Sequence, residues 1–256
     1  MLQPFTAWTA ALLVGIGFAV GAFGTVVGAG GGFILTPILL LLYPHDSPTT
    51  ITAISLAVVF FNAASGSAAY ARQRRIDYRS GIVFALATLP GAIGGALVVG
   101  LVSRSVFDGI MGGVLAVLAV WLAVGERWPL AVPENRLRRG ALYSLGVGFI
   151  SSFLGIGGGV IHVPLLVRAL GFPTHVATAT SHFVLAWMAG VGTVTHVVAG
   201  SFSHGHGLRR AAALSVGVVV GAQAGARVSQ RLRGHHIERL LAVALLALAG
   251  RLLLAL

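Results

Sequence analysis

Two glycine clusters are the most unusual feature of the sequence. One runs Gly28-Ala29-Gly30-Gly31-Gly32 and the other Gly155-Ile156-Gly157-Gly158-Gly159, and each opens a short apolar stretch. Glycine lets the backbone adopt positive φ angles, and a helix that starts after such a turn begins with unpaired N–H groups and the positive end of its dipole. That combination binds anions. The clusters therefore predict a substrate site built from backbone amides, at Gly28, Gly30, Gly31, Gly32, Gly155, Gly157, Gly158 and Gly159.

Both clusters also have a plain structural interpretation, because small residues let membrane helices pack closely. Similar spacings occur elsewhere in the chain, at the pairs Gly91/Gly95 and Gly109/Gly113. Two observations favour the anion site. The clusters recur at equivalent positions of a repeat, and each opens an undersized apolar stretch that carries a proline, Pro37 or Pro164. We expect these prolines to have a structural role.

Seven polar side chains inside apolar stretches could add hydrogen-bond donors to this site. They are Ser55, Asn62, His162, Thr180, Ser181, His182 and Gln223. The imidazole of His162, three residues past the second cluster, could donate to a bound oxyanion or change its protonation during transport, because imidazole titrates near neutral pH. A histidine bonded to a neighbouring helix is the alternative. Asn62 and Gln223 could equally bond across helices.

The other reactive side chains argue against catalysis and metal binding. The six acids, Asp46, Asp77, Asp108, Glu126, Glu134 and Glu238, all fall at the ends of apolar stretches, so none is placed for a proton or sodium relay. The chain contains no cysteine and neither of the motifs G-x-S-x-G and H-E-x-x-H. Four histidines, His204, His206, His235 and His236, give only a weak metal signal. We predict no enzyme activity, no resident metal and no cofactor.

Composition places the chain in a membrane. Of its 256 residues 57% are hydrophobic and 9% charged, and the mean hydropathy is +0.94, whereas a soluble domain carries about 25% charged residues. The basic residues are all arginine and cluster between apolar stretches, so the net charge of +11 indicates anchoring beside anionic lipid and no nucleic-acid partner.

Ten apolar stretches predict an all-α polytopic membrane protein. They span about 5–27, 32–43, 49–71, 80–102, 106–124, 140–155, 159–170, 174–199, 208–230 and 236–256. The first is expected to be a retained spanning helix, since no basic segment precedes it. The second and seventh are too short to span and are expected to form broken or re-entrant half-helices.

The chain divides into two homologous repeats of five stretches. The glycine clusters align at a constant offset of 127 residues, and Gly91–Ala96 corresponds to Gly221–Ala226. We predict one integral membrane domain, with a first repeat at 1–125, a polar linker at 126–139 and a second repeat at 140–256.

Arginine counts favour inverted repeats. If each half crosses five times, both termini lie outside and the repeats are inverted. The inner side then holds Arg72, Arg74, Arg75, Arg79, Arg127, Arg136, Arg138, Arg139, Arg227, Arg231, Arg233 and Arg239, and the outer side Arg104, Arg168, Arg209, Arg210 and Arg251. If the short segments re-enter without crossing, each half has four crossings and the preference weakens.

These motifs resemble the TauE/SafE family of sulfite and organosulfonate transporters. The resemblance covers nearly the whole chain and includes the paired G-x-G-G-G-x-x-x-x-P elements, the stretches Pro48–Ser55 and Pro173–Ser181, and the loop Tyr70–Arg79. One departure is the segment Ser201–Gly207, which replaces an aspartate-containing loop of the family. The resemblance implies transport of small sulfur oxyanions or sulfonates across the bacterial cytoplasmic (inner) membrane.

The sequence thus predicts a multi-pass secondary transporter whose partners are a small anion and the lipid bilayer. The glycine turns would hold sulfite, sulfoacetate or another organosulfonate near the midplane, with alternating access between the two sides. A passive anion channel and a transporter of another small carboxylate or oxyanion are the alternatives. A homodimer is left open.

Overall fold

The computed structural model describes residues 5–124, 135–202, 206–232 and 234–253, and these ranges contain helices and no strand. The helices are α1 (Ala7–Val27), α2 (Gly32–Leu42), α3 (Pro48–Arg72), α4 (Tyr78–Val98), η1 (Val99–Leu101), α5 (Arg104–Val124), α6 (Arg136–Leu154), α7 (Gly159–Pro164), η2 (Leu165–Ala169), α8 (Thr174–Val198), α9 (Gly207–Arg231) and α10 (Gly234–Leu253). Within these ranges, six helices are long and apolar enough to cross a membrane. The all-α polytopic class is confirmed.

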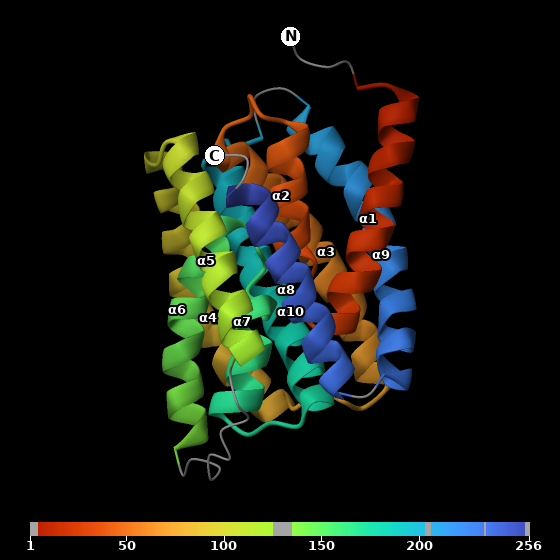
Figure 1. Ribbon diagram of the computed structural model, residues 1–256, viewed down its shortest axis with the longest axis vertical. Helices are drawn as coiled ribbons and strands as arrows, with labels where there is room; N and C mark the ends of the chain where they lie inside the picture. Colours follow the sequence, from red (N-terminus) through yellow and green to blue (C-terminus); the bar gives the residue numbers. More distant parts are fainter. Residues whose placement is uncertain (1–4, 125–134, 203–205, 233, 254–256) are drawn as a thin grey trace.

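Each half begins with a helical hairpin that turns inside the bundle. Figure 1 shows α1 entering from the upper end and α2 returning toward it, while α6 enters from the lower end and the α7–η2 stretch returns downward. The helices α3, α4 and α5, and likewise α8, α9 and α10, then run from one end to the other. By length and hydropathy α1 is one of the six candidate spans, and it ends at the inner turn.

The position of Arg168 differs from the expected one. Arg168 was assigned to the outer side, and this is wrong. It lies in η2 and donates to the carbonyl of Trp121 at 2.7 Å, near the end of α5 that leads to the linker.

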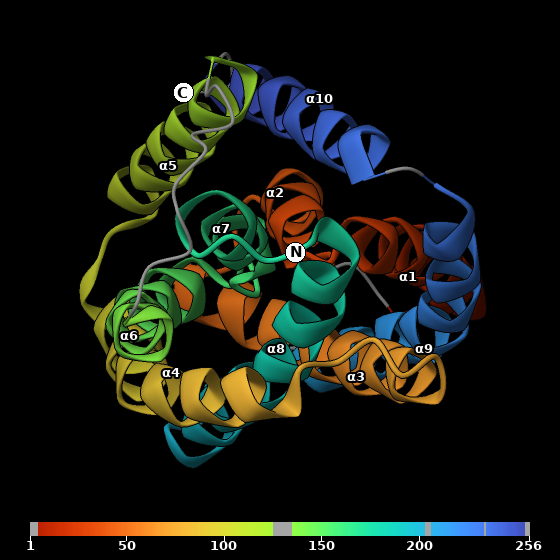
Figure 2. The same cartoon turned by 90° about the horizontal axis from the view of Figure 1, so that it is seen from below.

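The main helix pairs of the bundle are the same when the two halves are exchanged. Helix α1 of the first half packs on α9 of the second, and α6 of the second half packs on α4 of the first. The pairs α3–α9 and α8–α4 match in the same way, while α3–α8 and α5–α10 each join equivalent helices. Seen from below in Figure 2, α2 and α7 lie in the interior, enclosed by the longer helices.

Small residues explain how closely two of these pairs approach. A Cβ atom on Gly91 or Gly95 would collide with α6 backbone at Leu145 or Phe149, and one on Gly217 or Gly221 would collide with α1 backbone. Glycine is therefore required where α4 meets α6 and where α9 meets α1. The pair Gly109/Gly113 does not pack in this way, because a Cβ atom on either would meet nothing within 4 Å.

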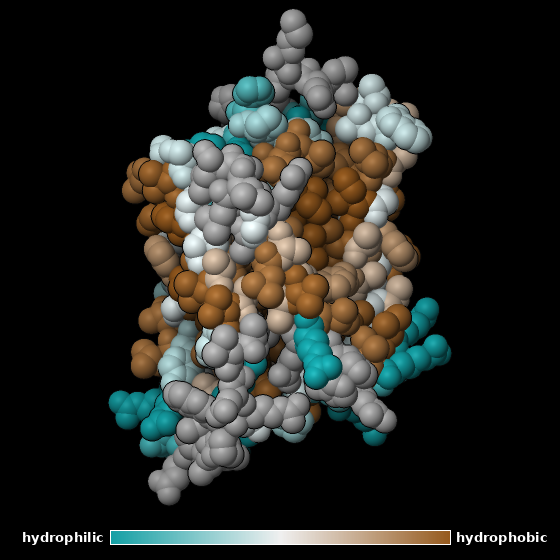
Figure 3. Space-filling model, viewed as in Figure 1, coloured by the Kyte–Doolittle hydropathy of each residue, from teal (hydrophilic) through white to brown (hydrophobic). Residues whose placement is uncertain are grey.

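The outer surface is suited to lipid. Large apolar side chains point outward along the helices, including Leu86, Val117 and Val194, each more than 60% exposed. Figure 3 shows apolar surface over the middle of one face and hydrophilic side chains at the lower end. The chain is a multi-pass membrane protein whose arginines gather mainly at one end.

Candidate functional site

The two glycine turns meet inside the bundle. A Cβ atom on Gly32 would lie 2.7 Å from the backbone of Ile156, and one on Gly159 would lie 2.6 Å from the Cα of Ala29. Each turn thus packs on the backbone of the other. Both turns also contact Val59, close to the middle of α3, so their junction lies near the midplane of the bundle.

Glycine is required in the turns for backbone conformation as well as for space. Gly28, Gly30 and Gly31 have φ angles of 76°, 75° and 78°, and Gly155, Gly157 and Gly158 have 68°, 77° and 65°. An L-residue with a side chain rarely adopts such angles. Of the eight glycines named from the sequence, these six have left-handed backbone whereas Gly32 and Gly159 do not, and the two turns have the same pattern of φ angles.

Each turn presents backbone N–H groups without acceptors. In the described structure the amides of Gly31, Gly32 and Phe33 donate no hydrogen bond, and neither do those of Gly157, Gly158 and Val160. The residues around them are fully enclosed, since 24–33 and 151–160 are all buried. An unpaired buried N–H costs about 1–3 kcal/mol. These six amides are the best candidates for donors to a ligand.

The turn carbonyls, in contrast, are tied to the long helices. Ser55 of α3 donates to the carbonyl of Gly155 at 2.7 Å. The hydroxyl of Thr36 lies 2.9 Å from the Ser55 hydroxyl and 2.9 Å from the same carbonyl oxygen. At the equivalent place, Ser181 of α8 donates to the carbonyl of Gly28 at 3.4 Å. The two serines named by the sequence therefore fix the turns.

A buried polar network supports the first turn. Asn62 donates to the carbonyl of Gly30 at 2.8 Å and accepts from the hydroxyl of Thr25 at 3.0 Å. The Nε2 of His182 lies 3.3 Å from the same hydroxyl, and Tyr70 donates to the carbonyl of Thr25 at 2.6 Å. Asn62 and His182 were expected near the turns. Thr25 and Tyr70 were not, because a threonine or tyrosine in an apolar stretch carries no distinctive signal.

Three other named side chains lie away from the junction. His162 is buried beside Ser144 of α6, at 3.2 Å, and against the ring of Phe84. Thr180 accepts from the backbone N–H of Asp77, at the start of α4. Gln223 donates to the carbonyl and hydroxyl of Ser65 at 2.8 and 2.9 Å, joining α9 to α3. The structure does not bring these three to the turns.

Prolines end or shape the short helices. Pro37 lies inside α2, which continues to Leu42, whereas Pro164 is the last residue of α7 and is followed by a five-residue π-helical stretch, η2. Proline cannot donate to the preceding turn of a helix, so local irregularity is expected at such positions.

Among the described residues there is no cluster of histidine and acid side chains that could hold a metal. Of the four histidines that gave a weak metal signal, His204 lies outside the described residues. The acids Asp46, Asp77 and Asp108 lie at or near helix ends and outside both turns.

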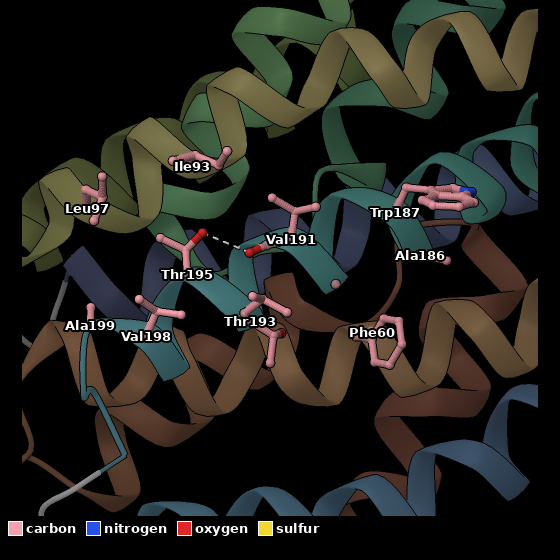
Figure 4. Close-up of a pocket in the computed structure, with 12 residues that line it drawn as sticks. Phe60, Ile93, Leu97, Ala186, Trp187, Val191, Thr193, Thr195, Val198 and Ala199 are labelled. Carbon is pink, nitrogen blue, oxygen red and sulfur yellow. Dashed lines mark hydrogen bonds between the residues drawn. The ribbon is translucent and has the colours of Figure 1, made fainter.

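A large surface hollow lies elsewhere and has a different character. It has a volume of about 760 Å³ and lies between α3, α4 and α8. Figure 4 shows it lined by apolar side chains such as Phe60, Ile93 and Trp187, with the hydroxyl of Thr195 turned back to the carbonyl of Val191 at 2.9 Å. No charged residue lines it, so it does not suit an anion.

Comparison with known proteins agrees with this architecture. The sequence model of the sulfite exporter TauE/SafE family matches residues 13–252. The chain belongs to the TauE/SafE family. The resemblance inferred from the glycine motifs is confirmed, and both turns lie inside the matched region.

Curated relatives of this TauE/SafE protein are described as transporters. The probable membrane transporter protein YunE of Bacillus subtilis is 27% identical, over 94% of this chain and 96% of its own length. A probable membrane transporter protein of Methanocaldococcus jannaschii is 25% identical, with 90% of each chain covered. One from Xylella fastidiosa is 29% identical over 65% of this chain and 64% of its own. No solved structure gives a significant match.

Proposed function

We propose that this multi-pass membrane protein is a secondary transporter of small sulfur-containing anions, such as sulfite, sulfoacetate or another organosulfonate. Membership of the TauE/SafE family and relatives described as membrane transporters support transport rather than catalysis. The same relatives and the six apolar spans support a location in the bacterial cytoplasmic membrane.

One observation carries the proposed site. Two glycine turns from opposite halves meet near the midplane, and each has three buried backbone amides without acceptors. Amides fixed in this way recognise the charge and size of an oxyanion. No acidic side chain contacts either turn among the described residues, so nothing there would repel an anion.

The burial of the turns favours a carrier over a passive channel. A channel needs a path along which the ion meets water on both sides, whereas residues 24–33 and 151–160 are all buried in this structure. Access therefore requires movement of the hairpins against α3 and α8. The directions and pairings of the helices support alternating access by one inverted repeat moving against the other.

Counterflow in proteoliposomes tests the proposal. Vesicles loaded with unlabelled sulfite or sulfoacetate should accumulate external labelled substrate, and accumulation should saturate. The variants Gly31→Leu and Gly158→Leu should abolish it, because each side chain would enter a turn that requires positive φ and lies against Val20 or Ser151.

Gly113→Leu is the matched control, since Gly113 faces open space and should keep full activity. Full activity of correctly inserted Gly31→Leu and Gly158→Leu proteins would refute the site. Flux that never saturates and shows no counterflow would identify a channel instead. Counterflow with acetate or another carboxylate, and none with sulfur anions, would change the substrate class.

A further inference from the structure

A second polar site lies at the arginine-rich end, well apart from the glycine turns. It is a cavity of about 420 Å³ where α4 and α6 begin. The cavity is lined by Asp77, Arg79, Ser80, Asn135, Arg136, Leu137 and Arg138. It combines three guanidinium groups with one carboxylate, so its charge is positive overall.

The single carboxylate is already engaged. Asp77 caps α4 by accepting from the backbone N–H of Ser80 at 3.2 Å and from its hydroxyl at 2.9 Å. It lies 3.8 Å from the guanidinium of Arg136, which is longer than a hydrogen bond. The guanidinium of Arg136 instead stacks on the ring of Phe172, at 4.2 Å from its centroid. This stacking fixes Arg136 while leaving its N–H groups available.

The other two arginines make no ion pair. Across the described part of the chain neither Arg79 nor Arg138 forms a salt bridge or hydrogen bond, and both side chains are exposed. Asn135, at the start of α6, makes no capping hydrogen bond. The cavity therefore collects donors from two helix starts with one weak acceptor among them.

We propose that this cavity binds a tetrahedral oxyanion group, a sulfate, sulfonate or phosphate, held by Arg79, Arg136 and Arg138. Guanidinium groups match such oxygens with paired, charge-assisted hydrogen bonds. The group has two sources, a soluble anion at the mouth of the protein or the phosphate of an anionic lipid head group. Because α4 and α6 belong to different halves, the occupant would contact both. The proposal does not depend on what the glycine turns bind.

Calorimetric titration tests the site with two probes. Purified protein in a neutral detergent is titrated with sodium sulfate in one arm and with a short-chain phosphatidylglycerol, below its micelle concentration, in the other. The variant Arg79→Gln/Arg138→Gln should weaken binding of at least one probe by about tenfold or more, because two charge-assisted contacts are lost. The control Arg72→Gln/Arg231→Gln removes the same charge from exposed positions outside the cavity and should leave binding unchanged.

The pattern of loss identifies the source and can overturn the site. Weakened sulfate binding alone points to a soluble anion, and weakened lipid binding alone to a head group. Equal weakening in both double variants would show diffuse attraction by the arginine-rich end and refute the cavity. The cavity site would also be refuted if the Arg79→Gln/Arg138→Gln variant bound both probes as tightly as the unaltered protein. The same holds if the unaltered protein bound neither probe.

Discussion

At the scale of single residues, the proposed site consists of backbone amides, and polar side chains hold the turns that carry them in place. Asn62 shows this clearly, because its amide satisfies the carbonyl of Gly30 and the hydroxyl of Thr25 at once, with no exposure to the surroundings. A side chain that is needed to fix the turn has a different mutational signature from one that only contacts substrate. Its loss should lower stability as well as transport.

We therefore predict that Asn62→Leu destabilises the protein by about 1–3 kcal/mol, since it leaves a buried carbonyl without a donor. Unfolding of the purified protein in mixed micelles measures this. Thr195→Val is the control, because Thr195 bonds only to its own helix and should change stability by less than about 0.5 kcal/mol. A stable Asn62→Leu protein with weakened substrate binding would mean that Asn62 contacts the substrate and does not support the turn.

Gly159 allows a test of the contact between the turns that leaves the left-handed positions unchanged. Its φ angle is not positive, yet a Cβ atom would collide with the backbone of Gly28 and Ala29. Gly159→Ala should lower the free energy of unfolding by about 1–3 kcal/mol through overpacking, and it should abolish counterflow. Gly113→Ala should instead be neutral or stabilise α5 by up to about 1 kcal/mol. Normal transport by Gly159→Ala would show that the turns need not touch.

The sequence predicted these glycines because backbone conformation depends on local residue type, but it could not distinguish the polar side chains from one another. Ser55, Ser181, Asn62 and His182 lie at the turns, whereas Thr180 and Gln223 join helices elsewhere. Which face of a helix meets the turns depends on how the helices cross. In a chain that is apolar almost throughout, hydrophobic periodicity carries little information about this.

At the scale of elements, the short helices depend on their outer ends being held. The chain after α2 is fixed by Arg210 of α9, whose guanidinium lies 2.6 Å from Asp46 and 3.7 Å from the centroid of the Tyr43 ring. Arg104 of α5 adds hydrogen bonds to the carbonyls of Leu40 and Asp46, each at 2.8 Å. Burial raises the pKa of the Tyr43 hydroxyl above its ordinary value.

We expect Arg210→Gln to destabilise the protein by about 1–3 kcal/mol, since the side chain of Arg210 is only 6% exposed and that of its partner 20%. The neighbouring Arg209→Gln should have little effect, because Arg209 is exposed. Thermal unfolding in detergent compares the two. If a double variant that also carries Asp46→Asn restores none of the lost stability, the effect does not arise from the ion pair.

Length was enough to predict the short helices but not their hairpin geometry. Segments of a dozen residues cannot span a bilayer, so α2 and α7 were expected to be partial. Helices α1 and α6 have 21 and 19 residues, lengths that fit a span, so their lengths did not indicate that each ends at a turn inside the bundle. Where they end depends on how far the turns sit inside the bundle, which is a property of the assembled helices.

At the scale of the whole molecule, the symmetry of the helix pairs supports the proposed alternating access. Exchanging the halves leaves the main packed pairs unchanged, with α3 against α8 at the centre and glycine-mediated contacts at α1–α9 and α4–α6. Two arrangements of such a bundle, one open to each side, would have nearly equal packing. This argument requires the halves to be inverted, so topology is the property to test.

Labelling of single introduced cysteines decides whether the two halves are inverted. The chain itself contains no cysteine that would give background labelling. Ser103→Cys, between α4 and α5, and Arg231→Cys, at the end of α9, occupy equivalent connections of the two halves, and both positions are exposed. In inverted repeats they face opposite sides of the membrane. With a membrane-impermeant maleimide applied to intact spheroplasts, Ser103→Cys should react and Arg231→Cys should react only after lysis, because the arginine-rich end faces the cytoplasm. Reaction of both from the same side would show parallel repeats, and the two turns could then not exchange roles as the protein opens to each side.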